Sequence, residues 1–158
     1  MICEDVCGTT VLQSAVSEVF ETMVFMEVEP KEVSEPFLAG DPWVMSSVAF
    51  RGNFDGVLTL VCSRDCARTV AMNMLALDDL NELDESDVAD TLGEITNMTM
   101  GTLKSNLYDV VGELAVSVPM VVSGTNVTSQ LGEADRKICA RVRIGREFDL
   151  DMTLIYKD

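Results

Sequence analysis

The chain has 158 residues, of which 47% are apolar, and its 27 acidic against 11 basic residues give a formal net charge of −16. This length and apolar content suffice for a sizeable hydrophobic core, so we expect residues 1–158 to form a single domain. The acidic charge argues against nucleic acid and against anionic membrane surfaces as partners, because both are bound through basic residues. It suits a partner that exposes a lysine or a basic patch.

Hydrophobic periodicity predicts two long helices and two antiparallel hairpins. The predicted elements are helix 9–27, strands 44–51 and 56–61, helix 63–75, helix 84–106, an extended segment 114–122 that Pro119 interrupts, and strands 138–144 and 148–156. Each half of the chain places a long helix before a hairpin. The expected fold is therefore α+β, with helices packed on an antiparallel sheet and a pseudo-two-fold internal repeat.

Two of these elements carry more detailed expectations. The first helix has an apolar stripe that is predicted to face the core, formed by Val11, Leu12, Ala15, Val19, Met23 and Met26. The last two strands alternate most regularly. Their arginines and aspartates are expected to share the solvent face across the hairpin.

Several classes of chemistry are excluded by what the chain lacks. It contains no histidine, so neither a Ser-His-Asp nor a Cys-His nucleophile can form. It has no GxxxxGK[ST] or GxGxxG loop to hold phosphates. The five cysteines include no CxxC pair and are expected to be reduced, and we predict no metal site.

The expected location is the cytoplasm. The chain opens with Met1-Ile2-Cys3-Glu4-Asp5, which lacks the features of a signal peptide. The longest apolar stretch, 110–122, is too short to span a bilayer, so no membrane association is expected.

The long helix carries the pattern with most chemical content. Asp90, Glu94 and Asn97 are four and three residues apart, which places them within roughly 60° of one another on a helix. The apolar stripe lies on the opposite side, so an acid and an amide look outward. Taken by itself, this spacing also fits an ordinary solvated helix face.

Two glycines accompany these polar residues. Gly93 and Gly101 lie on the same side of the helix, where each glycine costs about 1 kcal/mol relative to alanine. Close approach by another surface would explain them; incidental glycines on a solvated face are the alternative. Lys104 lies one turn further, and we interpret it as a surface lysine in preference to a phosphate contact.

The pattern Asp90-x3-Glu94-x2-Asn97, with Pro119 some two dozen residues after Glu94, resembles the signature of the CheC/CheX/FliY phosphatases of bacterial chemotaxis. The hairpin 44–61 and the serine-headed helix after it are also similar. The single signature and the chain length resemble the CheX branch most. The likeness covers most of the chain.

The resemblance implies a function. The substrate would be the aspartyl-phosphate of a CheY-like response regulator, which brings its own Mg²⁺, so this chain would bind no cofactor. Asn97 would orient the attacking water and Glu94 would pair with the receiver's lysine, both as catalytic residues. Asp90, Gly93 and Gly101 would contact the partner. The resemblance also suggests a homodimer, in which an exposed hairpin edge continues the sheet.

Three alternatives remain open at this stage. Ser14-x3-Glu18-x2-Glu21, with Pro42 later in the chain, is either a degenerate second copy of the motif or a set of exposed helix acids. The protein could be a non-catalytic docking module for a phosphorylated receiver, or a flagellar switch-type domain. It could also be an unrelated α+β interaction domain, in which the motif is incidental.

Overall fold

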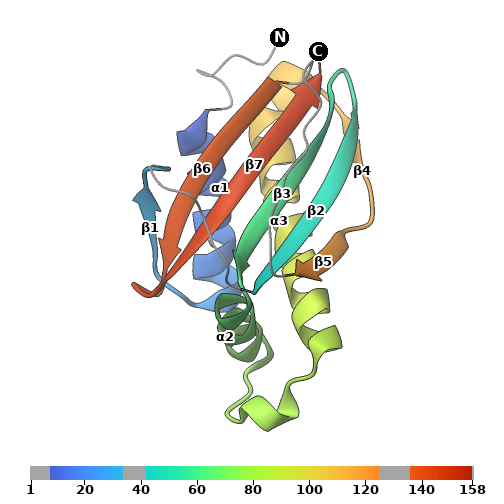
Figure 1. Ribbon diagram of the computed structural model, residues 1–158. Coiled ribbons are helices and arrows are strands. Elements are labelled where there is room, and N and C mark those ends of the chain that lie inside the picture. Colours follow the sequence, from blue (N-terminus) through green and yellow to red (C-terminus); the bar gives the residue numbers. More distant parts are fainter. Residues whose placement is uncertain (1–7, 34–41, 125–135, 158) are drawn as a thin grey trace.

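Figure 1 shows the computed structural model of the chain, which describes residues 8–33, 42–124 and 136–157. The elements are α1 Thr9–Val19, the π-helical turn η1 Phe20–Val24, β1 Val28–Lys31, β2 Trp43–Gly52, β3 Asp55–Ser63, α2 Arg64–Leu75, the short 3-10 turn η2 Leu80–Glu82, α3 Glu85–Val111, β4 Leu114–Val116, β5 Met120–Gly124, β6 Arg136–Ile144 and β7 Phe148–Lys157. The strands form one 7-stranded sheet in which every pairing is antiparallel. The α+β class is confirmed.

The sheet has the predicted two-fold character. Its order is β1-β6-β7-β3-β2-β4, with β5 also paired to β2. In each half of the chain, the short strand that follows the long helix pairs with the first strand of the other half's hairpin. The two hairpins meet where β3 pairs with β7. Each half of the chain thus contributes the short strand that lies at the outer edge of the other half's hairpin.

The helices cover one face of this sheet. In Figure 1, α1 and α3 lie behind the strands and α2 lies at the lower end. The strand side chains that point toward the helices alternate along each strand, as a half-buried sheet requires. Those of the central strands are all buried: Val44, Ser46, Val48 and Phe50 of β2; Leu58, Leu60 and Cys62 of β3; and Leu150, Met152, Leu154 and Tyr156 of β7.

The first helix departs from its prediction. It changes into the π-helical turn η1 at Phe20, and the wider turn moves the buried stripe by one position. Phe20 and Val24 are therefore fully buried, whereas Met23, predicted to face the core, is 45% exposed. The chain then forms the short strand β1 directly after the predicted helix end at residue 27, where no strand was predicted.

Helix α3 begins as predicted and is longer than predicted. Asp84 caps it: its carboxylate accepts from the Asp87 N–H and the Asp87 carboxylate accepts from the Asp84 N–H. Bonds from the Ser86 hydroxyl and from the Asp87 N–H lower the pKa of Asp84. The helix continues past the predicted end at residue 106, because Leu107 and Val111 extend its buried stripe.

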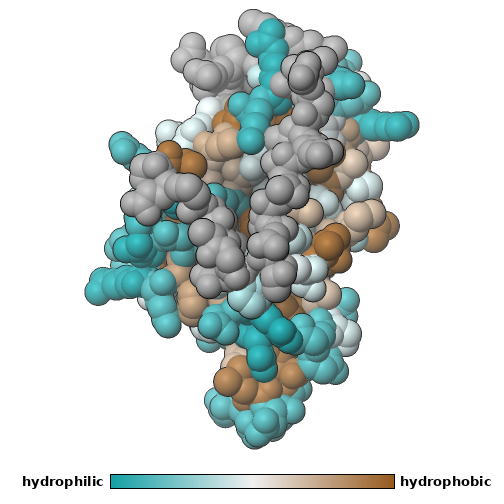
Figure 2. Space-filling view, viewed as in Figure 1, coloured by the Kyte–Doolittle hydropathy of each residue, from teal (hydrophilic) through white to brown (hydrophobic). Residues whose placement is uncertain are grey.

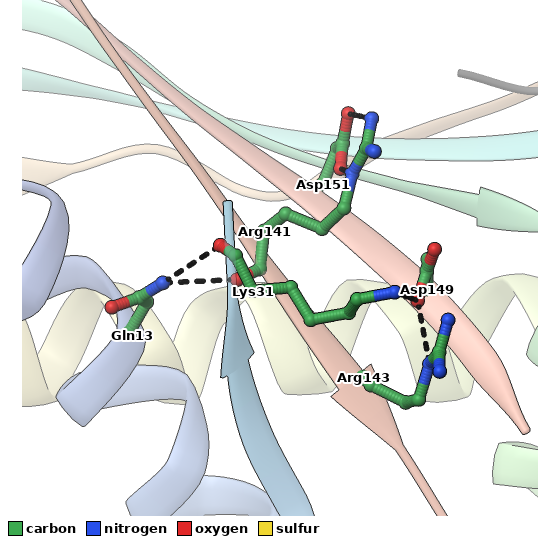
Figure 3. A network of polar contacts seen from close by, with 6 residues as sticks. All are labelled: Gln13, Lys31, Arg141, Arg143, Asp149 and Asp151. Atoms are coloured by element: carbon green, nitrogen blue, oxygen red, sulfur yellow. Dashed lines mark hydrogen bonds and ion pairs between the residues drawn. The ribbon is translucent and has the colours of Figure 1, made fainter. Parts of the chain in front are cut away.

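The arginines and aspartates of the last hairpin pair as expected. Arg141 lies opposite Asp151 and Arg143 opposite Asp149. Figure 3 shows the two ion pairs, with Lys31 of β1 reaching Asp149 as well. The expected solvent exposure is wrong for Arg141, which is only 5% exposed; its guanidinium makes two bonds to Asp151, at 2.6 and 3.1 Å.

The predicted exposed hairpin edge is present in part, because among the described residues no strand pairs with the outer side of β6 along 136–140. β6 is covered along 141–144 by β1, and β2 is covered by β4 and β5. Within the described residues, β5 forms an edge of the sheet, and it exposes Met120 (67%) and Val122 (43%). In the space-filling view, apolar side chains gather beside β5 and at the lower tip below α2 (Figure 2).

Candidate functional site

The three polar residues of the motif lie on one exposed strip of α3. Asp90, Glu94 and Asn97 are all exposed. They point away from the sheet, since the opposite side of the helix is buried through Val88, Leu92 and Ile95.

A buried polar contact fixes the rotation of α3. The Thr96 hydroxyl lies 2.7 Å from the Ser46 hydroxyl of β2, and both residues are fully buried. The same Thr96 oxygen also donates to the Leu92 carbonyl of the preceding turn, at 2.8 Å. Rotating α3 would leave the buried Ser46 hydroxyl without this partner, which costs about 1–3 kcal/mol, whereas the Thr96–Leu92 bond lies within the helix and moves with it. Asn97, the next residue, is thus held pointing outward.

The two carboxylates and the amide of the motif bond no other side chain or backbone group in the described part of the chain. Within 8–33, 42–124 and 136–157, no residue forms a hydrogen bond or an ion pair with the side chain of Asp90, Glu94 or Asn97. An amide both donates and accepts, and a carboxylate only accepts. The strip therefore offers a donor–acceptor pair and two negative charges to whatever approaches it.

Gly93 allows a close contact inside the chain. A Cβ added to Gly93 would lie 3.3 Å from Pro119 Cβ and 3.6 Å from Val121 Cγ2, and Gly93 is buried. Between β4 and β5, residues 117–119 stand opposite only Val48 and Ala49, which makes a bulge that contains Pro119. The close approach expected from a partner at Gly93 is made here by the chain's own proline.

Gly101 has the opposite environment. No atom lies within 4 Å of a Cβ built on it, and the residue is exposed. Lys104, one turn further, pairs with Glu113 at 3.0 Å, in agreement with its interpretation as a surface lysine. Close approach by another molecule is therefore possible at Gly101.

A groove that was not predicted borders this strip. It has a volume of about 410 Å³ and separates the end of α1 and η1 from the second half of α3. Its walls include Glu18, Thr22 and Met23 on one side and Met98 and Gly101 on the other. The sequence signal was weak, because regular helical spacing places Met23 in the core and nothing in the sequence announces the π-helical turn.

The two interpretations of the acids on α1 depend on how α1 compares with α3. Glu94 lies 20 residues before Leu114, the first residue of β4, whereas Glu18 lies only 10 residues before Val28, the first residue of β1. Counted from the helix starts, however, Ser14, Glu18 and Glu21 take the same places along α1 and η1 as Asp90, Glu94 and Asn97 take in α3, so the second-copy interpretation stays open. Pro42 precedes β2 directly and does not occupy the place of Pro119. Glu18 and Glu21 are exposed in either case.

The cysteines are not arranged as a site. Cys62 and Cys66 are buried free thiols, where the hydrogen bond between them and burial raise the pKa of the Cys66 thiol. Over the described residues, no group of three or more Cys, Asp or Glu side chains is placed to hold a metal ion. None of the helices described is long and apolar enough to cross a membrane. Cys3 and Cys7 lie outside the described residues.

The family model of chemotaxis phosphatase CheX matches residues 44–143. These residues contain the first hairpin, α2 and all of α3, and thus the whole strip. No curated protein matches the sequence. The family match by itself covers more than half of the chain.

Solved structures agree with this match. Chemotaxis protein CheX of Vibrio vulnificus is 23% identical, with 94% of this chain and 95% of that chain covered and a TM-score of 0.77. A CheC-like superfamily protein of Shewanella sp. PV-4 is 25% identical, with 94% and 96% covered and a TM-score of 0.77. CheX from the CheX–CheY–BeF₃–Mg²⁺ complex of Borrelia burgdorferi is 18% identical, with 94% and 97% covered and a TM-score of 0.74. The chain belongs to the CheX family of chemotaxis phosphatases.

Proposed function

We propose that this protein hydrolyses the aspartyl-phosphate of a CheY-like response regulator. The observation that carries the proposal is the exposed strip of α3, where Glu94 and Asn97 are rigidly placed and have no hydrogen-bonding partner among the described residues. Membership of the CheX family supports it, as does the solved complex of a CheX relative with CheY.

Asn97 is the residue to which we assign the chemistry. Phosphoryl transfer requires mainly an aligned nucleophile and charge stabilisation, so a protein without histidine can accelerate it. Inserted into the receiver, the amide oxygen accepts a hydrogen bond from a water and the amide N–H donates to an oxygen near the phosphoryl group. The water is thereby held in line with the phosphorus, which is the source of the acceleration.

Glu94 is the docking residue in this proposal. Its carboxylate is one turn from Asn97 and pairs with the lysine of the receiver's active site. Removing one partner of such a pair, when the interface excludes water, costs about 2–5 kcal/mol of binding, much of it because the other charge is left unpaired. Asp90, a further turn away on the same strip, contacts the receiver's surface, and Gly101 lets that surface approach the helix backbone.

The receiver brings its own Mg²⁺, and this chain binds no cofactor. The ion supplies charge stabilisation at the phosphoryl oxygens. Within the described ranges, the carboxylates of the strip form no cluster that would hold an ion. Because the substrate is a cytoplasmic signalling protein, we place the activity in the cytoplasm.

The direct test is phosphate release. A CheY-like receiver from the same organism is phosphorylated with a small-molecule phosphodonor, and its dephosphorylation is followed with and without this protein. Acceleration by the wild type, and none by Asn97→Ala, supports the proposal. The matched amide control is Asn73→Ala on the exposed face of α2, which should act as wild type. Binding without acceleration would instead make the protein a docking module.

We also propose a homodimer formed through the edge of the sheet. β5 exposes Met120 and Val122, and Val118 just before it is 86% exposed. An edge strand with apolar side chains is a ready site for pairing with a second copy. Light scattering of the wild type and of Val118→Lys tests this; a wild-type monomer at micromolar concentration would contradict it.

A further inference from the structure

We infer that the groove between η1 and α3 is the second half of the docking surface, and that it takes an aliphatic or aromatic side chain, flanked by a basic residue, from the phosphorylated receiver. This inference rests on the proposed function. It adds a binding site that neither the sequence motif nor the family match contains.

The groove is continuous with the strip that carries Glu94 and Asn97. Gly101, in its wall, lies one helical turn after Asn97, and Met98 is the residue next to Asn97. One turn of α-helix is 5.4 Å long. A stable interface covers about 800 Å² on each partner, which corresponds to a patch roughly 30 Å across. A receiver seated over Asn97 therefore also covers the groove.

The π-helical turn opens this groove to solvent. Along a regular helix Met23 would be buried, but the wider turn of η1 places Val24 in the core and leaves Met23 45% exposed in the groove wall. Phe25 ends the turn at φ 61°, in the left-handed region that a phenylalanine adopts only at a cost, and it is 78% exposed. π-helical turns and such strained residues gather at functional sites.

The residues that line the groove, and their charge, indicate which side chain of the receiver would bind there. Gly101 has no atom within 4 Å of an added Cβ, so a side chain from another molecule can lie directly on the helix backbone there. Met23, Met98 and Val19 supply apolar and adaptable contacts. Glu18 lines one wall and Glu94 lies on the adjoining strip, so a basic residue beside the inserted apolar group is favoured.

A kinetic experiment tests the groove separately from the chemistry. Gly101→Phe fills the groove with an aromatic ring while leaving Glu94 and Asn97 in place. We expect KM for the phosphorylated receiver to rise about tenfold or more, with kcat within about twofold of wild type, because docking contacts act on binding. Asn73→Phe on the exposed face of α2, which adds the same ring away from the groove and the strip, is the matched control and should change KM by less than about twofold.

A second variant acts from the opposite wall. Thr22→Arg adds bulk and positive charge to the groove, at an exposed residue whose hydroxyl bonds only the Glu18 carbonyl. It should raise KM as Gly101→Phe does, and circular dichroism identifies any variant that fails to fold. If the wild type is active and the folded variants have an unchanged KM, the groove takes no part in docking and the inference is wrong. The proposed function would not be affected by that result. A wild type that neither binds nor dephosphorylates the receiver would overturn both.

Discussion

Two polar surfaces of this molecule use the same residue types in different ways. On the outer face of β6 and β7, Arg141 is bonded to Asp151, and Asp149 is shared by Arg143 and Lys31 (Figure 3). On the outward face of α3, Asp90, Glu94 and Asn97 bond no other residue among those described. A carboxylate that is paired within the chain stabilises the fold. One left without a partner on a rigid helix is available to another molecule.

The largest effect should follow from changing Asn97 to its acidic isostere. Asn97→Asp keeps the shape of the side chain but removes the N–H donor and adds a charge that repels the phosphoryl group. Loss of one positioned donor costs on the order of 10²–10³ in rate, so we expect at least that loss in kcat. Stopped-flow phosphate release measures it. Asn73→Asp on α2 is the control. An equal loss of kcat in Asn97→Asp and Asn73→Asp would contradict the special role of the α3 strip.

Substitutions in the ion pairs of β6 and β7 should change the stability of the fold. Asp151→Ala removes both bonds that the Arg141 guanidinium, which is 5% exposed, donates to this carboxylate, and should lower the free energy of unfolding by about 3 kcal/mol. Asp149→Ala removes pairs with the more exposed Arg143 and Lys31, and should cost less than about 1 kcal/mol. Urea unfolding measures both. Similar losses of unfolding free energy in the two variants would mean that burial does not determine how much each ion pair stabilises the fold.

Glu94→Gln should affect partner binding without affecting stability. The neutral amide keeps the size of the side chain and loses the charge proposed to face the receiver's lysine, so the Kd for the receiver should rise about tenfold or more. Isothermal titration with beryllofluoride-activated receiver gives this value. Glu21→Gln, an exposed acid on the π-helical turn, should leave Kd unchanged. A rise of the same size in Glu21→Gln would point to general electrostatics.

Substitutions at the two glycines of α3 should change stability with opposite signs. Gly101→Ala meets no atom within 4 Å and should stabilise the helix by about 0.5–1 kcal/mol. Gly93→Val places branched carbons against Pro119 and should destabilise the protein by about 1–3 kcal/mol. Thermal unfolding distinguishes them. Stabilisation by Gly93→Val would show that the bulge around Pro119 can shift to accommodate the larger side chain at little cost.

The sequence predicted the parts of the fold that depend on local periodicity. Both hairpins, the start of α3 near residue 84 and the helix after Ser63 follow from alternation, apolar stripes and the Ser63 cap. The π-helical turn could not be predicted, because Phe20 and Met23 fit a regular helix equally well. The pairing of β1 with β6 joins segments more than 100 residues apart, and no local pattern encodes it.

The candidate site was predicted as a set of residues but not as a surface. Offsets of three and four place Asp90, Glu94 and Asn97 together on any helix. Their outward orientation depends on the Thr96–Ser46 contact with β2, which is a tertiary contact. The contrast between Gly93 and Gly101 likewise depends on where Pro119 lies. The groove depends on the separation of two helices, which spacing along one helix does not reveal.

The most direct test compares wild type and Asn97→Ala at concentrations that saturate the phosphorylated receiver. The account predicts that the wild type shortens the lifetime of the receiver's aspartyl-phosphate, whereas saturating Asn97→Ala, bound with a similar Kd, leaves it as in the receiver alone. Dephosphorylation by Asn97→Ala at the wild-type rate would contradict the assignment of the chemistry to the α3 strip.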